Sequence, residues 1–283
     1  MKITFLGTGT SCGVPMPTCT CEVCTSQDPR DSRLRASILV ETDDNKNILI
    51  DCGPDFRQQA LKNNIGRLDA LFITHNHFDH CAGLDDLRAY AFRNPLDAYA
   101  DETVTRTLNN HYDYIFIHRY PGVPQVNLNT ISPEDTVTVG DTKIIPIRVF
   151  HGKLPILAFR IGKLAYITDC TCIPDTEWSK LEGIDTLIID ALRWKSHPTH
   201  WSVDEAMLAV NRIKPRHTYF THMSHDIGLH EEVNKMLAPN VELAFDGMTV
   251  TVQGIMEVHE IKADGADDMV PPLQLVMAFD EFR

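Results

Sequence analysis

The stretch FITHNHFDHCAG, residues 72–83, decides how this sequence is interpreted. An apolar run ends within it, and four polar side chains follow in six residues: His75, His77, Asp79 and His80. Side chains two positions apart on an extended chain face the same way, so the first two can meet one cation while the last two, one turn on, reach a second. Imidazole and carboxylate are ligands that Zn²⁺ prefers in sites with an open coordination position. The stretch predicts a two-metal centre at a strand end, and a polar surface turn with scattered histidines is the weaker explanation.

Three more candidates close apolar strands elsewhere in the chain. His151 ends IIPIRVFH, Asp169 ends LAYITD and His222 ends TYFTH. Each of them alone is more often a cap or a surface side chain, but together they stand where α/β folds place their sites. Five histidines and two aspartates suit a two-metal site with a bridging carboxylate.

Short apolar runs alternate with amphipathic stretches along the 283 residues, and no repeat or low-complexity tract interrupts them. The pattern predicts strands at 2–9, 37–42, 47–53, 68–75, 186–191 and 217–222, hairpins at 136–151, 157–170 and 241–252, and helices at 54–64, 82–92, 202–213 and 230–237. Strands packed into two sheets with helices outside suit this order. The aromatic and proline-rich segment 113–135 receives no assignment.

The motif THNHFDH (residues 74–80) resembles the T-H-x-H-x-D-H motif of the metallo-β-lactamase superfamily. FLGTGTSCGVP (5–15) and NILIDCGPD (47–55) resemble its ribonuclease Z-like phosphodiesterase branch. The resemblance implies an α/β fold, the αββα four-layer sandwich, as a single hydrolase domain over residues 1–253 with a C-terminal extension, 254–283, of unknown role. It assigns one metal to His75, His77 and His151, the second to Asp79, His80 and His222, and the bridging position to Asp169.

Three of the eight cysteines, Cys19, Cys21 and Cys24, lie in the short loop CTCEVC. With His225, three residues past His222, they make a Cys₃His set suited to a closed structural zinc site. The arrangement resembles the phosphoribosyl cyclic phosphate diesterases of the bacterial carbon–phosphorus lyase pathway. Unpaired thiols are the main alternative, and a redox C-x-x-C is a weaker one because no thioredoxin-like strand precedes it.

The remaining cysteines and several histidines receive weaker predictions. HWSVDEA fits the H-x-[ST]-x-x-x-A pattern of ribonuclease Z-like enzymes, so His200 is expected to join Asp79 as a catalytic residue, outside the ligand set. Asp51 is expected to be a structural hydrogen-bonding residue and His197 a plain loop residue. Cys170 and Cys172 are expected to be buried thiols near the metals. Packing roles are expected for Cys12, Cys52 and Cys81, and surface or core positions for His111, His118, His217, His230 and His259.

The chain is acidic, with a formal net charge of −13 and a pI near 5.4, so its overall field repels phosphate backbones. No secretory signal or membrane-length apolar stretch is evident, which predicts a cytoplasmic protein with reduced cysteines. The expected function is metal-dependent hydrolysis of a small linear or cyclic phosphodiester by a metal-bridging hydroxide, with Zn²⁺ or Mn²⁺ in the catalytic site. A ribonuclease Z-like tRNA 3′ endonuclease and a glyoxalase II-like thioester hydrolase are the alternatives. We expect no large nucleic acid and no membrane as partner, and a homodimer is compatible with the sequence.

Overall fold

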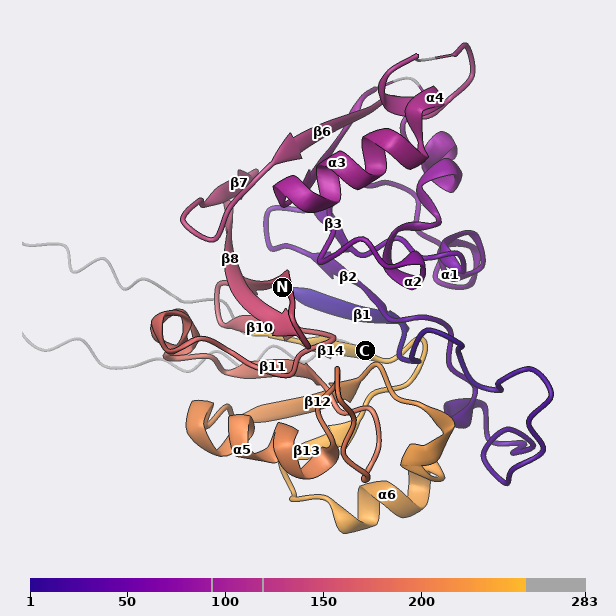
Figure 1. Ribbon diagram of the computed structural model, residues 1–283, viewed down its shortest axis with the longest axis vertical. Helices are drawn as coiled ribbons and strands as arrows, with labels where there is room; N and C mark the ends of the chain where they lie inside the picture. The colour runs from indigo at the N-terminus through magenta and orange to yellow at the C-terminus, as the bar shows by residue number, and fades with distance from the viewer. Residues whose placement is uncertain (93, 119, 253–283) are drawn as a thin grey trace, which may run out of the picture.

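The computed structural model describes residues 1–92, 94–118 and 120–252, which form two seven-stranded sheets packed face to face (Figure 1). The first sheet, in the order β14-β1-β2-β3-β4-β5-β6, contains β1 (Lys2–Gly7), β2 (Ser37–Glu41), β3 (Asn47–Ile50), β4 (Ala70–Phe72), β5 (Leu96–Ala100), β6 (Val126–Thr130) and β14 (Thr249–Thr251). The second, in the order β13-β12-β11-β10-β9-β8-β7, contains β7 (Val137–Val139), β8 (Thr142–His151), β9 (Leu154–Ile161), β10 (Leu164–Ile167), β11 (Thr186–Asp190), β12 (His217–Thr221) and β13 (Val241–Leu243).

Helices cover the outer face of each sheet, as Figure 1 shows. Beside the first sheet lie α1 (Phe56–Lys62), α2 (Phe78–Cys81), α3 (Glu102–His111) and α4 (Asp113–Phe116), and beside the second lie α5 (Val203–Ile213) and α6 (His230–Met236). Four 3₁₀ helices occupy connecting segments: η1 (Pro29–Asp31), η2 (Leu84–Ala89), η3 (Asp175–Leu181) and η4 (His225–Ile227). α5 begins at a capping box, in which Ser202 and Glu205 satisfy each other's backbone N–H groups.

Three apolar clusters hold these four layers together. One lies between the sheets and includes Phe5, Phe72, Phe159 and Ile188. The others join each sheet to its helices, through Leu49, Phe56 and Leu108 on one side and through Leu187, Ile189 and Ala206 on the other. Alternate residues of one strand, such as those of β11, therefore face different layers, as the period of two requires. The predicted αββα four-layer sandwich is confirmed.

The strand directions bring the predicted ligand positions to one edge. β3 to β6 run parallel to one another, and so do β10 to β13. β8 is antiparallel to β9, which is antiparallel to β10, so β8 ends at the same edge as β10. A backbone hydrogen bond links the two sheets there, from Leu157 N to Thr74 O at 3.0 Å. The carboxyl ends of β4, β8, β10 and β12 therefore meet around one site.

Two expected elements are wrong. Residues 241–252 do not form a hairpin, because β13 lies in the second sheet and β14 in the first. The connecting turn crosses between them, since the half-buried Asp246 accepts hydrogen bonds from Leu34 N and Thr8 Oγ1, and Gly247 N donates to Phe5 O. Such long-range bonds leave no local signal in the sequence.

The predicted helix 82–92 is also replaced, by the 3₁₀ helix η2, which follows the short α2. Gly83 separates them, because its backbone packs so closely on the preceding loop that an added Cβ would lie 2.1 Å from Gly53 O. β5 and β6 lie where the sequence pattern predicts no strand. The predicted extension 254–283 lies outside the described residues. Within the described part of the chain, no helix is long and apolar enough to cross a membrane.

Candidate metal centre

The first predicted ligand set converges at the ends of β4, β8 and β10. His75 Nε2 lies 3.0 Å from His77 Nδ1 and 3.7 Å from Asp169 Oδ2. The ring centroids of His77 and His151 are 5.0 Å apart. Each of the four residues offers one donor atom within 4.8 Å of the others. Ligands about 2.0–2.1 Å from a tetrahedral ion stand about 3.3 Å apart, so this cluster is close to the size that one cation requires.

The second predicted set lies beside the first and shares Asp169 with it. His80 Nε2 lies 3.2 Å from Asp79 Oδ2 and 3.3 Å from Asp169 Oδ1. His222 Nε2 is 3.3 Å from the same two oxygens. Asp169 therefore turns Oδ2 toward the first cluster and Oδ1 toward the second, which is the arrangement of a bridging carboxylate.

Hydrogen bonds behind the histidines orient their rings. His80 Nδ1 lies 2.7 Å from Asp51 Oδ2, and His151 Nδ1 lies 2.5 Å from Thr199 O. Asp51 also accepts from the backbone N–H and the hydroxyl of Thr74, whose Oγ1 is 3.0 Å from His75 Nδ1. These partners direct each Nε2 lone pair into the clusters, as the outer hydrogen bonds of metal-binding histidines do. The hydrogen-bonding role predicted for Asp51 is confirmed.

Backbone strain is concentrated at the same edge. Asp51, Asp169 and His222 have φ of +65°, +53° and +56°, a region that non-glycine residues seldom adopt. All three directly follow or lie just beyond the end of a strand, so the left-handed turn re-aims each side chain toward the clusters. Strain of this kind persists only where the surrounding structure holds it, and it gathers at functional sites.

The buried carboxylates of the site suit the binding of cations. Four buried carboxylates, Asp51, Asp79, Asp169 and Asp190, have only histidines as ion-pair partners in the described chain. Burial alone would raise the pKa of Asp169, but the imidazoles of His222 and His80 hold it well below its ordinary value.

The buried imidazole nitrogens also indicate that the site suits cations. His80 Nε2 is buried and faces the oxygens of Asp79 and Asp169 at 3.2 and 3.3 Å, yet among the described residues it makes no hydrogen bond of good geometry. Buried charges are stable only when paired or bound to metal, so carboxylates and inward-facing imidazoles in this number fit divalent ions. The residues present therefore suit the metals that the family resemblance implies.

His200 lies at the edge of this site and belongs to neither cluster. Its ring stacks on His222, with centroids 4.9 Å apart, and its Nδ1 lies 3.6 Å from Asp190 Oδ2. Burial alone would lower the pKa of His200, but the carboxylate of Asp190 raises it above its ordinary value. Asp190 was not among the predicted site residues, although it ends the apolar strand β11 and Asp169 similarly follows β10.

The cysteine loop, residues 19–24, meets His225 at the start of η4. Cys19 Sγ and Cys21 Sγ lie 3.4 Å and 3.2 Å from His225 Nδ1, and Cys24 completes a set whose donor atoms lie within 4.8 Å of one another. The hydrogen bond with His225, and then that from Cys24 N–H, lowers the pKa of Cys21 to about 6. Burial raises the pKa of Cys24 to about 11. Three thiols this close can all lose their protons only with a cation among them.

The other predicted residues divide into confirmed and corrected ones. Cys52, Cys81 and Cys170 are buried as expected, but Cys12 and Cys172 are exposed, because the turns that carry them face solvent. His111, His118 and His217 are exposed and His230 is buried, whereas His259 lies outside the described residues. His197 lies in a loop, as expected, and its ring centroid is 5.3 Å from that of His200.

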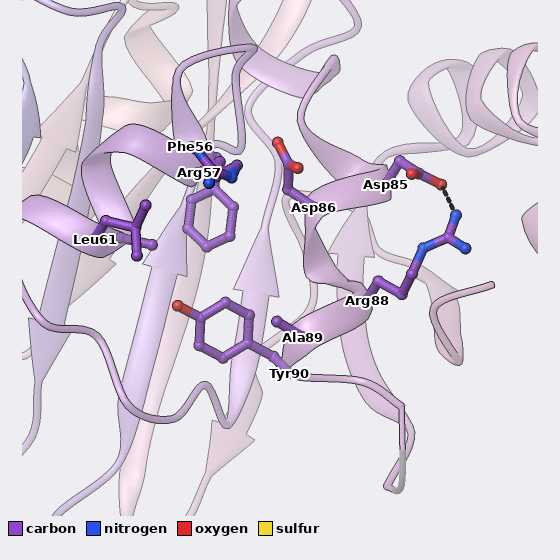
Figure 2. Close-up of a pocket in the computed structure, with 9 residues that line it drawn as sticks. Phe56, Arg57, Leu61, Asp85, Asp86, Arg88, Ala89 and Tyr90 are labelled. Atoms are coloured by element: carbon purple, nitrogen blue, oxygen red, sulfur yellow. Dashed lines mark hydrogen bonds and ion pairs between the residues drawn. The ribbon is translucent and has the colours of Figure 1, made fainter. Parts of the chain in front are cut away.

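A separate pocket of about 490 Å³ lies between α1 and η2. Figure 2 shows the rings of Phe56 and Tyr90 in it, 5.7 Å apart, and Asp85 paired with Arg88 at 2.7 Å. Its nine lining residues include no member of the ligand sets, so this pocket is distinct from the candidate metal centre.

Comparison with known proteins supplies the family. The model of the beta-lactamase superfamily domain matches residues 46–223. A crystal structure of a new diphosphatase from the PhnP family is 42% identical, with a TM-score of 0.83, and covers 88% of this chain and 96% of that chain. The Zn²⁺-bound PqqB from Methylobacterium extorquens, 20% identical with a TM-score of 0.75, covers 89% of this chain and 100% of that chain and shares the fold.

A curated relative gives a further comparison. An octanoyltransferase from Porphyromonas gingivalis is 40% identical over 254 residues, which are 89% of this chain and 52% of that protein. The chain thus spans about half the length of this relative. All seven candidate ligands of the two clusters and His200 lie inside the segment that the family model matches, and this segment is more than half of the chain. The chain belongs to the β-lactamase superfamily and has the metallo-β-lactamase fold.

Proposed function

We propose that this superfamily hydrolase is a phosphodiesterase that acts on a small phosphodiester, linear or cyclic. The observation that carries the proposal is a single imidazole, His200, beside two adjacent clusters that suit divalent cations and outside both of them. Two metals can face the oxygens of one phosphate, and an acid beside them can serve a departing alcohol. The 42% identity to a PhnP-family diphosphatase supports phosphate chemistry.

The seven side chains of the two clusters would hold the ions, which when bound supply Lewis-acid stabilisation and lower the pKa of a water toward about 7. Asp79 orients the attacking water with the carboxylate oxygen that does not face His80 and His222. His200, directed by Asp190 at its Nδ1, gives the proton of Nε2 to the leaving alkoxide. Zn²⁺ and Mn²⁺ both accept this donor set.

Hydrolysis of a panel of substrates tests the proposal. Bis(p-nitrophenyl) phosphate, a dinucleotide diphosphate, a tRNA precursor and a glutathione thioester represent the phosphodiesterase, diphosphatase, ribonuclease Z-like and glyoxalase II-like activities. We expect turnover of the first two at rates well above the others. The net negative charge of the chain disfavours binding of the tRNA precursor. Turnover of the thioester alone would contradict the proposal. Acyl transfer is not proposed, because the chain covers 52% of the octanoyltransferase.

Metal analysis should find three ions per chain, two exchangeable and one tightly held zinc. His77 is exposed, so ions bound in the two His/Asp clusters can exchange with the solvent. A Cys₃His set, in contrast, binds zinc with the affinity of a closed structural site. Protein purified without chelator and then dialysed mildly against EDTA should therefore keep one zinc. Simultaneous loss of all the metal would argue against a structural zinc at the cysteine loop.

Replacing Cys24 with serine should lower the melting temperature and remove the EDTA-resistant zinc. Metal binding to a site that exists only in the folded chain contributes directly to folding free energy, and loss of a ligand removes part of it. Cys12→Ser is the matched control, because Cys12 is exposed and belongs to no ligand set. A Cys24→Ser protein with wild-type zinc content and wild-type melting temperature would contradict the assignment.

A further inference from the structure

We propose that His197 binds the leaving group of the phosphodiester through a hydrogen bond, and is thereby a specificity residue distinct from the acid His200. The proposal rests on the function proposed above and deepens it. It names the class of substrate as a diester whose leaving alcohol carries further hydroxyl groups, as a sugar does.

The imidazoles of the site form a row that leads outward to His197. The His200 ring lies 4.6 Å from that of His151, and the His197 ring lies 5.3 Å beyond it at an interplanar angle of 41°. Exposure rises along this row, since His151 and His200 are each 8% exposed and His197 is half-buried. His197 is therefore the next polar ring on this loop after His200 on the way to solvent.

The hydrogen-bond pattern of His197 leaves one donor for a ligand. Its Nδ1 lies 3.4 Å from Thr199 N and 3.3 Å from Thr199 Oγ1. The backbone N–H can only donate, so Nδ1 is the acceptor and the proton of the neutral ring is on Nε2. Burial, and then the nearby His200 and Arg193, lowers the pKa of His197, which favours this neutral ring. Nε2–H thus remains available to an oxygen outside the protein.

The loop that carries His197 is fixed rather than loose. Arg193 donates from Nε to Lys195 O at 3.1 Å and pairs with Asp226 at 3.3 Å, next to the cysteine loop's partner His225. Trp194 Nε1 donates to Ile227 O at 2.9 Å. A binding group held on such a platform loses little freedom when a ligand arrives, so its hydrogen bond contributes to affinity.

The position of the leaving group follows from the position of its proton donor, His200. The phosphate must lie over the clusters, and the leaving oxygen must face His200 to receive its proton. The remainder of the leaving group then extends away from the clusters, past His200 and along the row to His197. A hydroxyl two or three bonds from the leaving oxygen is in the right direction to accept from Nε2–H, whereas p-nitrophenol offers no hydroxyl there.

Two matched diesters test this inference: methyl glyceryl phosphate and methyl 2-methoxyethyl phosphate, whose leaving alcohols are of similar acidity but differ in free hydroxyls. The metal-loaded full chain is assayed as wild type, His197→Ala, His197→Gln and His217→Ala, a control that changes an exposed histidine at the other end of β12 from His222. Loss of one hydrogen bond should lower kcat/KM about tenfold for the glyceryl ester, mainly through KM. The methoxyethyl ester and bis(p-nitrophenyl) phosphate should change less than about twofold.

The supporting result is this selective loss, with partial recovery in His197→Gln, whose amide can donate, and with unchanged metal content and melting temperature. Equal losses on both alkyl esters would overturn the inference and give His197 a role in positioning His200. An unchanged His197→Ala would also overturn it, while leaving the phosphodiesterase assignment intact. A wild-type protein that is inactive on every phosphodiester would overturn both proposals.

Discussion

Asp169→Ala should abolish turnover of every phosphodiester while the chain stays folded. Among the described residues, Asp169 is the one side chain that belongs to both clusters, with Oδ2 3.7 Å from His75 and Oδ1 3.3 Å from His80 and from His222. Removing it takes a shared ligand from both ions and with it several kcal/mol of transition-state charge stabilisation. Since each 1.4 kcal/mol or so is a factor of ten, the expected loss in kcat/KM is about 10³-fold or more.

Metal content separates this effect from unfolding. The variant should lose exchangeable metal but keep the EDTA-resistant zinc, because Cys19, Cys21, Cys24 and His225 form a set that shares no residue with the clusters. Asp175→Ala, which changes a side chain that is 98% exposed, is the matched control and should behave as wild type in both assays. An Asp169→Ala protein that retains its exchangeable metal and its rate would refute the bridging assignment.

The ligand positions could be predicted from the sequence because His151, Asp169 and His222 end or closely follow apolar strands, and the other four stand together in one short motif after β4. In parallel strands such ends meet at one sheet edge, so position along the chain translates directly into position in space. His151, Asp169 and His222 came together for this reason although they are far apart in sequence. The cysteine set was found by the chemistry of its residue types, which few other roles would require at that spacing.

The parts that were missed depend on contacts without a local pattern. Asp190 and His197 are candidates only because the fold places each of them beside the ring of His200. The segment 244–248 resembles a hairpin turn because its Asp-Gly pair is a turn signal, and the distant partners Leu34, Thr8 and Phe5 show that it joins the two sheets. β5 reads LDAYA, and because aspartate and alanine are depleted in strands its composition gives only a weak strand signal.

His200→Ala should lose activity in proportion to how much the leaving group needs a proton. The ring lies outside both ligand sets, so the variant should keep its metal. Loss of a general acid typically lowers a rate by about 10²–10⁴, and we expect this loss for a diester of an alkyl or ribose alcohol. p-Nitrophenol departs without protonation, so bis(p-nitrophenyl) phosphate should keep most of its rate. The measurement is kcat/KM on both substrates, with His111→Ala, an exposed histidine at the end of α3, as the matched control.

Asp190→Asn tests the same role of His200 more selectively. It keeps the shape of the side chain and removes the charge that faces Nδ1 of His200 at 3.6 Å. If Asp190 acts through His200, the variant should show the same dependence on leaving group, in smaller degree, and should add almost nothing to the loss in His200→Ala. Additive losses would give Asp190 a separate role, since residues that act as a unit are non-additive in a double-mutant cycle. Equal losses on both substrates in His200→Ala would instead assign the ring to phosphate binding, and loss of metal would make it a ligand.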